Sequence, residues 1–217
     1  MSPKPAPSTE AAPGRPSATG EVRLVKKRRP NTRQLILDEA ALLFKERGFG
    51  NSSMRDLGAR VGLDAASMYN HIKSKDEILE IICFQVANTY ITQLTEVEAM
   101  AATCREKITA LIGLHVRLIT RQGAAVSVAN NDWKYLTGDK LTAFKDARKR
   151  YEQGFATLIE QGIAAGELQP VNVSVALFTI LSAVRWVELW YRPTRSLSAK
   201  ELETNIIRML LNGLALK

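Results

Sequence analysis

The residues with the clearest chemical use lie in one short run near the start of the chain, from Ala65 to His71. Two alanines open the run, and hydroxyl, amide and imidazole groups follow them. Small and hydrogen-bonding side chains at the front of a short helix can enter the major groove of DNA, reach base edges and let the backbone approach. The run therefore predicts a DNA-reading helix, and its candidate contact residues are Ala65, Ala66, Ser67, Tyr69, Asn70 and His71.

Two short helices joined at Gly62 are predicted to hold this run in place. Ser53 can cap the first helix, with Asp56 three residues on as its partner in a capping box, and Asp64 can cap the second helix. Each helix also has two apolar residues four positions apart that can face a common core. These pairs are Leu57 with Val61 and Met68 with Ile72. The pattern is the outline of a helix-turn-helix.

Catalytic residues are poorly represented in the chain. The second of its two histidines, His115, lies among leucines, and we expect a buried core group rather than a catalyst. The sequence has no G-x-S-x-G turn, phosphate-binding glycine loop or H-E-x-x-H motif. Glu106 and Glu152 are expected on solvated helix faces. We therefore expect no enzymatic activity, no metal site and no cofactor.

The positive charge is concentrated at the start of the chain. The net charge is +8 over 217 residues, and residues 1–31 contain seven Lys or Arg against two Glu. Residues 1–30 are also rich in Pro, Ala, Ser and Thr, which predicts a disordered segment. We expect a basic arm that contacts nucleic acid, with a simple solubilising tail as the alternative.

The cysteines and the apolar runs indicate in which cellular compartment the protein is expected. Cys83 and Cys104 form no C-x-x-C motif, and residues 1–30 contain no apolar stretch of the kind found in signal peptides. The longest apolar run, Val175 to Tyr191, includes Arg185 and Glu188 and falls short of the roughly 20 apolar residues that span a bilayer. We expect a reduced, cytoplasmic protein without a membrane segment.

The rest of the chain has helical periodicity and no alternating strand pattern. The fold class is therefore predicted to be all-α, with a three-helix head (residues 31–76) followed by a helical bundle for ligand binding and dimerisation (residues 77–217). Helices are expected at about 32–47, 74–96, 103–121, 126–134, 138–165, 172–191 and 198–215.

The run from Val175 to Tyr191 also predicts a homodimer. Its polar residues recur only at every third position, so the predicted helix is apolar over most of its circumference. Such a helix has to be covered on several sides, by its own core and by a partner subunit. With the last helix, which has Leu202, Ile206 and Met209 along one side, it could form a four-helix interface with two-fold symmetry.

One further pattern runs in a single register through residues 32–79. It consists of Ala40, Phe44, Arg47-Gly48-Phe49, Ser53, Asp56-Leu57, Val61-Gly62-Leu63, Tyr69-Asn70-His71-Ile72 and Ser74 to Leu79. This pattern resembles the DNA-binding end of the TetR family of bacterial one-component repressors. Two positions depart from the family: Ile72 stands where an aromatic residue is commoner, and Asp64 stands where Ser or Thr is commoner. The charge of Asp64 makes it a helix cap rather than a DNA contact.

The resemblance implies roles for individual residues in DNA binding. Residues 53–55 resemble the family's positioning contacts, and residues 65–67 open its recognition helix. Tyr69, His71 and Lys75 resemble its phosphate anchors. The positioning contacts are therefore Ser53, Met54 and Arg55, and the residues that open the recognition helix are Ala65, Ala66 and Ser67.

The second half of the chain resembles a subgroup that controls the breakdown of fatty acids, aromatic acids or sterols and often senses acyl-CoA thioesters. The resemblance lies in residues 131–133, 145–151, 186–193 and 197–202. Aromatic residues could line an acyl pocket and arginines could meet anionic phosphates. The candidate ligand residues are Trp133, Arg148, Arg185, Trp186 and Trp190. Alternatively, the tryptophans are core or interface residues and the basic run is a solvated face.

The predicted function is a homodimeric transcriptional repressor that binds a palindromic double-stranded DNA operator and is released by a small-molecule effector, for which the resemblance suggests an acyl-CoA. Two alternatives stay open. A ligand-independent architectural DNA-binding protein would share the basic arm and the head, and a helical enzyme or carrier acting on acyl-CoA would share the pocket.

Overall fold

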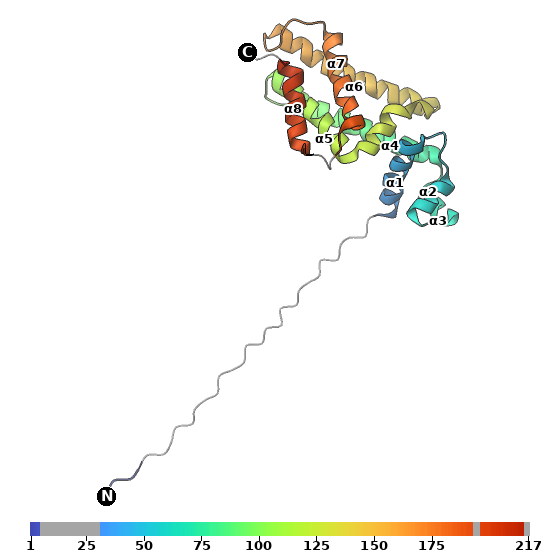
Figure 1. Ribbon diagram of the computed structural model, residues 1–217, viewed down its shortest axis with the longest axis vertical. Coiled ribbons are helices and arrows are strands. Elements are labelled where there is room, and N and C mark those ends of the chain that lie inside the picture. Colours follow the sequence, from blue (N-terminus) through green and yellow to red (C-terminus); the bar gives the residue numbers. More distant parts are fainter. Residues whose placement is uncertain (5–30, 193–195, 215–217) are drawn as a thin grey trace. The chain divides into compact units, whose positions relative to one another are not determined.

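The computed structural model describes residues 1–4, 31–192 and 196–214. The predicted basic arm therefore lies outside the described residues, apart from its first four. Every regular element in the described part of the chain is a helix, which confirms the predicted all-α fold (Figure 1). In chain order the elements are α1 (Thr32–Arg47), α2 (Met54–Val61), α3 (Ala65–Tyr69), α4 (Lys75–Glu98), α5 (Cys104–Asn131), the short 3-10 helix η1 (Trp133–Tyr135), α6 (Gly138–Ala164), α7 (Val173–Trp190) and α8 (Ala199–Asn212).

The head forms as its capping residues predict. The Ser53 side chain accepts a hydrogen bond from the Asp56 backbone N–H at 3.1 Å, and the Asp56 carboxylate accepts one from the Ser53 N–H at 3.0 Å. The Asp64 carboxylate accepts from the Ser67 N–H at 2.8 Å and starts α3. Between the helices Gly62 has a φ of 68°, a left-handed conformation that favours glycine.

The two short helices pack closely because α2 has a glycine, Gly58, where it meets the turn. A Cβ on Gly58 would lie 2.8 Å from the carbonyl oxygen of Leu63, so α2 can approach the turn only without a side chain at this position. Leu57, Met68 and Ile72 are buried in the core that α1 shares with them. Their burial confirms the predicted inward faces, and it orients the opposite side of α3 outward.

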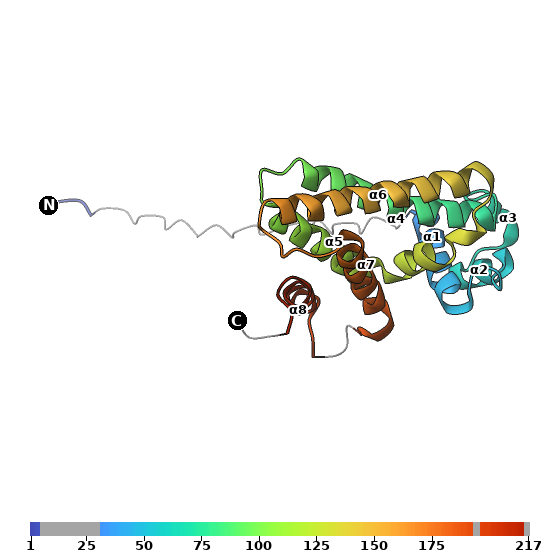
Figure 2. The same cartoon turned by 90° about the horizontal axis from the view of Figure 1, so that it is seen from above.

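Helix α5 is the centre of the body. It packs against α1, α4, α6, α7 and α8, and α4 also packs against α6 (Figure 2). Because α1 belongs to the head, α5 joins the head and the body through direct packing. Buried residues of α5 on several sides, among them Leu111, Gly113, Leu114 and Val116, account for this central position.

The break predicted between the helices 103–121 and 126–134 is a kink inside one helix, α5. Gln122 has φ −133° and ψ 35°, which departs from helical geometry between two helical stretches of α5. The second stretch ends at Asn131 rather than near residue 134, because Asp132 caps the helix and residues 133–135 tighten into η1. The predicted boundary at residue 134 was therefore wrong by three residues.

Helix α7 is long and apolar enough, by length and composition, to cross a membrane. One side of it is buried in the body, through Leu177, Ile180, Val184 and Val187. A helix with one side packed into a core passes the same test as a membrane span, so this composition alone does not indicate a membrane protein.

Candidate functional sites

The predicted DNA-reading residues lie on the exposed side of the head. Tyr69 is 54% exposed, and Ala66, Asn70 and His71 are exposed as well. Ser67 is half-buried, and its hydroxyl donates to the Asp64 carboxylate at 3.1 Å. The Ser67 hydroxyl therefore keeps its lone pairs for an incoming donor. Ala65 is the first residue of α3.

The first turn of α2 has one exposed cation. Arg55 is exposed and points away from the core, whereas Met54 is half-buried against it. Ser53 is exposed, but its hydroxyl and backbone N–H are both engaged with Asp56. Of these three residues, Arg55 has the charge and the exposure that a phosphate or base contact requires.

Lys75 has structural partners that the sequence did not reveal. Its Nζ donates to the carbonyl oxygens of Phe49 and Ser52, both at 2.8 Å, and lies 4.2 Å from the centre of the Phe49 ring. The ammonium therefore holds the loop before α2 to the start of α4. Because an ammonium has three donors, one remains for a phosphate, and the role of Lys75 in DNA binding stays a prediction.

A short segment at the end of α5 connects the body with this loop; we call residues 129–135 the connecting segment. The Phe49 backbone N–H donates a hydrogen bond to the buried Asp132 carboxyl group. The Phe49 ring also lies 5.2 Å from the Tyr135 ring and 5.2 Å from the Phe44 ring of α1. Burial raises the pKa of Asp132. The hydrogen bond from Phe49 lowers this pKa, but its effect is smaller than that of burial.

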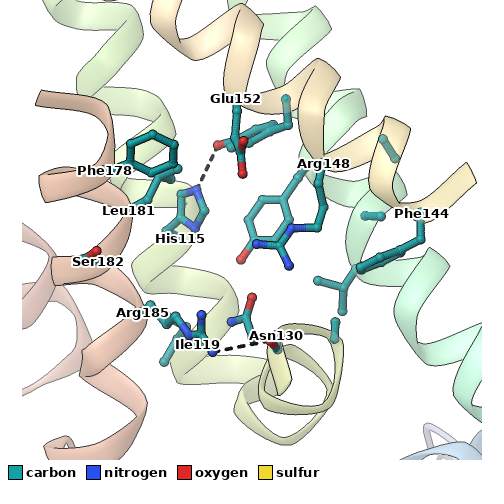
Figure 3. A pocket seen from close by; sticks show the side chains of 16 residues that line it. His115, Ile119, Asn130, Phe144, Arg148, Glu152, Phe178, Leu181, Ser182 and Arg185 are labelled. Carbon is teal, nitrogen blue, oxygen red and sulfur yellow. Dashed lines mark hydrogen bonds between the residues drawn. The ribbon is translucent and has the colours of Figure 1, made fainter. Parts of the chain in front are cut away.

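A cavity of about 190 Å³ lies between α4, α5, α6 and α7 (Figure 3). Its wall combines apolar side chains with several polar and charged ones. The lining residues are Val86, Ala87, Tyr90, His115, Ile119, Ala129, Asn130, Phe144, Ala147, Arg148, Tyr151, Glu152, Phe178, Leu181, Ser182 and Arg185.

Three aromatic residues from three helices form part of this wall. His115 of α5 shares a hydrogen bond of 2.9 Å with the Tyr151 hydroxyl of α6, and its ring stacks on Tyr90 of α4 at 4.5 Å (Figure 3). Burial lowers the pKa of His115 to about 4 and raises the pKa of both tyrosines. At neutral pH the cluster is therefore an uncharged set of hydrogen-bonding groups.

Arginines occupy two other parts of the wall. Arg185 of α7 donates to the Asn131 side chain at 2.7 Å and to the Asn130 carbonyl at 3.3 Å, so it holds the connecting segment (Figure 3). The Arg148 guanidinium of α6 lies 5.3 Å from the centre of the Trp133 ring. Among the described residues Arg148 has no hydrogen bond or ion pair, so its donors are available to an anionic or carbonyl group.

The structure divides the five candidate ligand residues into three groups. Arg148 and Arg185 line the cavity, and Trp133 lies behind the wall, stacked on Phe144 at 6.1 Å. Trp186 and Trp190 do not line the cavity; they are 61% and 47% exposed on the outer side of α7. A ligand role for these two residues has no support from the cavity, because their direction along α7 takes them away from it.

Sequence reasoning also missed residues of the cavity. Glu152 was expected on a solvated face, but it is half-buried and lines the cavity. His115 is buried as predicted, yet it also forms cavity wall. The available signal was a histidine inside an apolar stripe, and nothing local identified Tyr151, which lies 36 residues away, as its partner.

Comparisons with known proteins agree for both halves of the chain. Residues 36–82 match the family described as bacterial regulatory proteins, tetR family, and residues 101–214 match the tetracyclin repressor-like, C-terminal domain. The HTH-type transcriptional repressor KstR2 of Rhodococcus jostii (strain RHA1) is 26% identical over 183 residues, which cover 83% of this chain and 89% of that protein.

Two solved structures have the same fold. The structure of AibR in complex with isovaleryl coenzyme A and operator DNA matches with a TM-score of 0.73 and 25% identity, over 83% of this chain and 98% of that chain. KstR2 of Mycobacterium tuberculosis matches with a TM-score of 0.80 and 22% identity, over 87% of this chain and 97% of that chain. The fold is therefore shared across the head and the body together.

Proposed function

This chain belongs to the tetR family of bacterial regulatory proteins, and from that premise we propose that it is a dimeric repressor whose cavity binds a small-molecule effector. The observation that carries the proposal is the connecting segment. Ala129 and Asn130 line the cavity, while Asp132 and Tyr135 contact Phe49 at the base of the head. One seven-residue stretch thus touches both the proposed effector site and the DNA-binding part.

The proposed DNA contacts come from α3 and its neighbours. The exposure of Ala66, Tyr69, Asn70 and His71 supports entry of this face into the major groove, with Ala65 and Ser67 at its front. Ser53, Met54 and Arg55 would position the head, with Arg55 as the charged contact, and Lys75 would meet a phosphate with its remaining donor. We place the end of this DNA-binding part at residue 76, where α4 begins its first turn.

The proposed dimer uses the outer side of α7 together with α8. Trp186, Leu189 and Trp190 are each about half exposed or more, and Met209 of α8 is 46% exposed. Large apolar residues gathered on one face of a monomer mark an interaction site, since isolated soluble chains rarely leave such a patch open. A second copy would cover this face and hold the two heads at a fixed separation.

The proposed effector is an acyl-CoA thioester, as in the AibR complex named above. The volume of about 190 Å³ lies below the 300–1,000 Å³ of sites for drug-sized ligands, so the cavity can take the acyl part alone. Arg148 has free donors for the thioester carbonyl or a phosphate oxygen. Lys149 and Arg150 are exposed on the same helix and can meet the charged coenzyme outside the cavity.

Release from DNA requires only a modest coupling between the two sites. A ligand that displaces Asn130, or that competes for Arg185, would move the connecting segment and with it the loop that carries Phe49. A coupling free energy of roughly 1–3 kcal/mol would change operator affinity about 5- to 150-fold. The hydrogen bond between Asp132 and Phe49 and the aromatic pair of Tyr135 and Phe49 are interactions of about 0.5–1.5 kcal/mol each, which matches this range.

An electrophoretic shift with the DNA upstream of the protein's own gene tests the proposal, repeated with a panel of acyl-CoAs. Binding of one palindromic site by the dimer, and its release by an acyl-CoA, is the expected result. Weak sequence preference without a ligand effect would instead favour an architectural DNA-binding protein. Turnover of an acyl-CoA by a protein lacking residues 53–75 would favour an enzyme; we propose that the protein has no such activity and acts in the cytoplasm.

A further inference from the structure

The hydroxyl groups at the inner wall of the cavity have hydrogen-bonding capacity that the protein does not use. Among the described residues the Tyr90 hydroxyl has no hydrogen-bond partner, although Tyr90 lines the cavity. The bond between His115 and Tyr151 uses either the hydrogen or a lone pair of the Tyr151 hydroxyl, and the other stays available. Both hydroxyls belong to side chains packed against His115, since Tyr90 stacks on its ring and Tyr151 meets it edge-on, and the two tyrosine rings lie 5.3 Å apart in one region of the wall.

The charge around these groups limits what they can receive. His115 is neutral because burial lowers its pKa to about 4, so it offers no positive charge to a carboxylate. Glu188 of α7 has a carboxylate oxygen, Oε2, that is buried without a partner among the described residues, and its charge contributes to raising the pKa of Tyr90. An anionic group placed here would be repelled by Glu188 and would compete with the thioester for Arg148, whose donors the proposed function assigns to the thioester carbonyl or a phosphate oxygen.

A purely hydrocarbon occupant fits this region poorly as well. Buried hydroxyls that lose their water and gain no partner weaken binding by about 5- to 150-fold each, the equivalent of roughly 1–3 kcal/mol. The remaining lining residues on this side, Val86, Ile119 and Leu181, offer apolar contact to the rest of the ligand. The region combines an apolar surround with a few uncharged polar groups, as sites that select a specific ligand do.

We propose that the effector's acyl group carries an uncharged oxygen, a hydroxyl or a ketone, that hydrogen-bonds to Tyr90 and to the His115–Tyr151 pair. The inference rests on the proposed function only for the thioester part of the ligand. The oxygen-binding region itself is defined by residues of α4, α5 and α6, and it would select an oxygenated compound whether or not coenzyme A is attached.

The test compares pairs of ligands that differ by one oxygen, with the full-length chain and isothermal titration calorimetry. The pairs are butyryl-CoA with 3-hydroxybutyryl-CoA and 4-hydroxybutyryl-CoA, and benzoyl-CoA with 3-hydroxybenzoyl-CoA and 4-hydroxybenzoyl-CoA. At least one hydroxylated thioester should bind about tenfold or more tightly than its parent. The proposal is overturned if both parents bind as tightly as all of their hydroxylated partners.

Variants of the two cavity tyrosines test whether the preference for hydroxylated ligands comes from the cavity. Tyr90→Phe and Tyr151→Phe remove only a hydroxyl, and each should bring hydroxylated and parent thioesters to within about threefold, because the hydroxylated ligand loses a partner and the parent no longer leaves that hydroxyl unpaired. Tyr191→Phe, at the end of α7 and outside the cavity lining, should keep the full preference. Thermal melting by circular dichroism identifies a variant that fails to fold, and an unchanged preference in both folded cavity variants contradicts the assignment.

A second set of compounds separates this inference from the proposed function. Benzene and phenol test the oxygen-binding region without a thioester. Tighter binding of phenol than of benzene, lost in Tyr90→Phe, would support the inference even if no acyl-CoA releases the protein from DNA. If no oxygenated member of either set binds more tightly than its parent, the inference is wrong even when an acyl-CoA does release the DNA.

Discussion

His115 should make the protein lose stability in mild acid, by an amount that its burial sets. The folded state holds the imidazole neutral, with a pKa of about 4 in place of 6.5, because the side chain is buried between Tyr90 and Tyr151. Below pH 6.5 the unfolded chain takes up a proton that the folded chain does not bind until about pH 4. The free energy of unfolding therefore falls as the pH decreases through this window.

The pKa shift of His115 sets the size of this loss of stability. One pKa unit corresponds to about 1.36 kcal/mol, so the full difference is on the order of 3 kcal/mol for each protomer, and roughly 2 kcal/mol of it is lost by pH 5. His115→Gln keeps a neutral group that can still hydrogen-bond to the Tyr151 hydroxyl but cannot be protonated. Between pH 7.5 and pH 5.0 the wild-type protein should lose about 2 kcal/mol more than this variant.

Urea denaturation followed by circular dichroism, at one fixed protein concentration, measures the difference. The other ionisable side chains that face the cluster, Glu152, Glu188 and Arg148, are common to both proteins, so their contributions cancel in the comparison. His71→Gln serves as the control because it removes the exposed histidine of the head. A wild-type protein that loses no more stability than His115→Gln on acidification would show that the imidazole is not held neutral by burial.

Three further predictions concern the head, the connecting segment and the dimer. Lys75→Ala should weaken binding to the operator and to unrelated duplexes about equally, and it should lower the slope of log affinity against log salt concentration by about one unit. Fluorescence anisotropy at several salt concentrations measures both effects. Unchanged operator binding would rule out the phosphate contact. Asp132→Ala removes the acceptor for the Phe49 N–H and should reduce the effect of an acyl-CoA on operator release by fivefold or more in gel shifts. Asp132→Asn keeps an acceptor, and its response to the acyl-CoA should stay near that of the wild type. Because burial raises the pKa of Asp132 above 3.8, the ionised carboxylate costs stability at neutral pH, and denaturation should show no loss for Asp132→Asn at pH 7. Trp186→Glu places a charge on the exposed face of α7 and should shift the protein to monomers in sedimentation, while Trp133→Phe, behind the cavity wall, should leave the dimer intact.

The helices and the head were accessible from the sequence because their signals are local. Ser53 with Asp56, Gly62 and Asp64 act within a few residues of their own backbone, so their capping and turn geometry could be predicted and was confirmed. The spacing of Leu57, Met68 and Ile72 likewise identified the buried faces. Family resemblance added the expected function, since the same local pattern recurs in related regulators.

The position and lining of the cavity depend on contacts between distant parts of the chain. His115 meets Tyr151 across 36 residues, and Lys75 meets the Phe49 carbonyl across 26; no local pattern encodes either pairing. The tryptophans show the same limit: the sequence offered them either as ligand residues or as core and interface residues, and only the structure shows that Trp133 lies behind the cavity wall and that Trp186 faces outward. Which way a side chain points depends on the rotation of its helix against its neighbours, and that rotation is determined only when the whole core packs together.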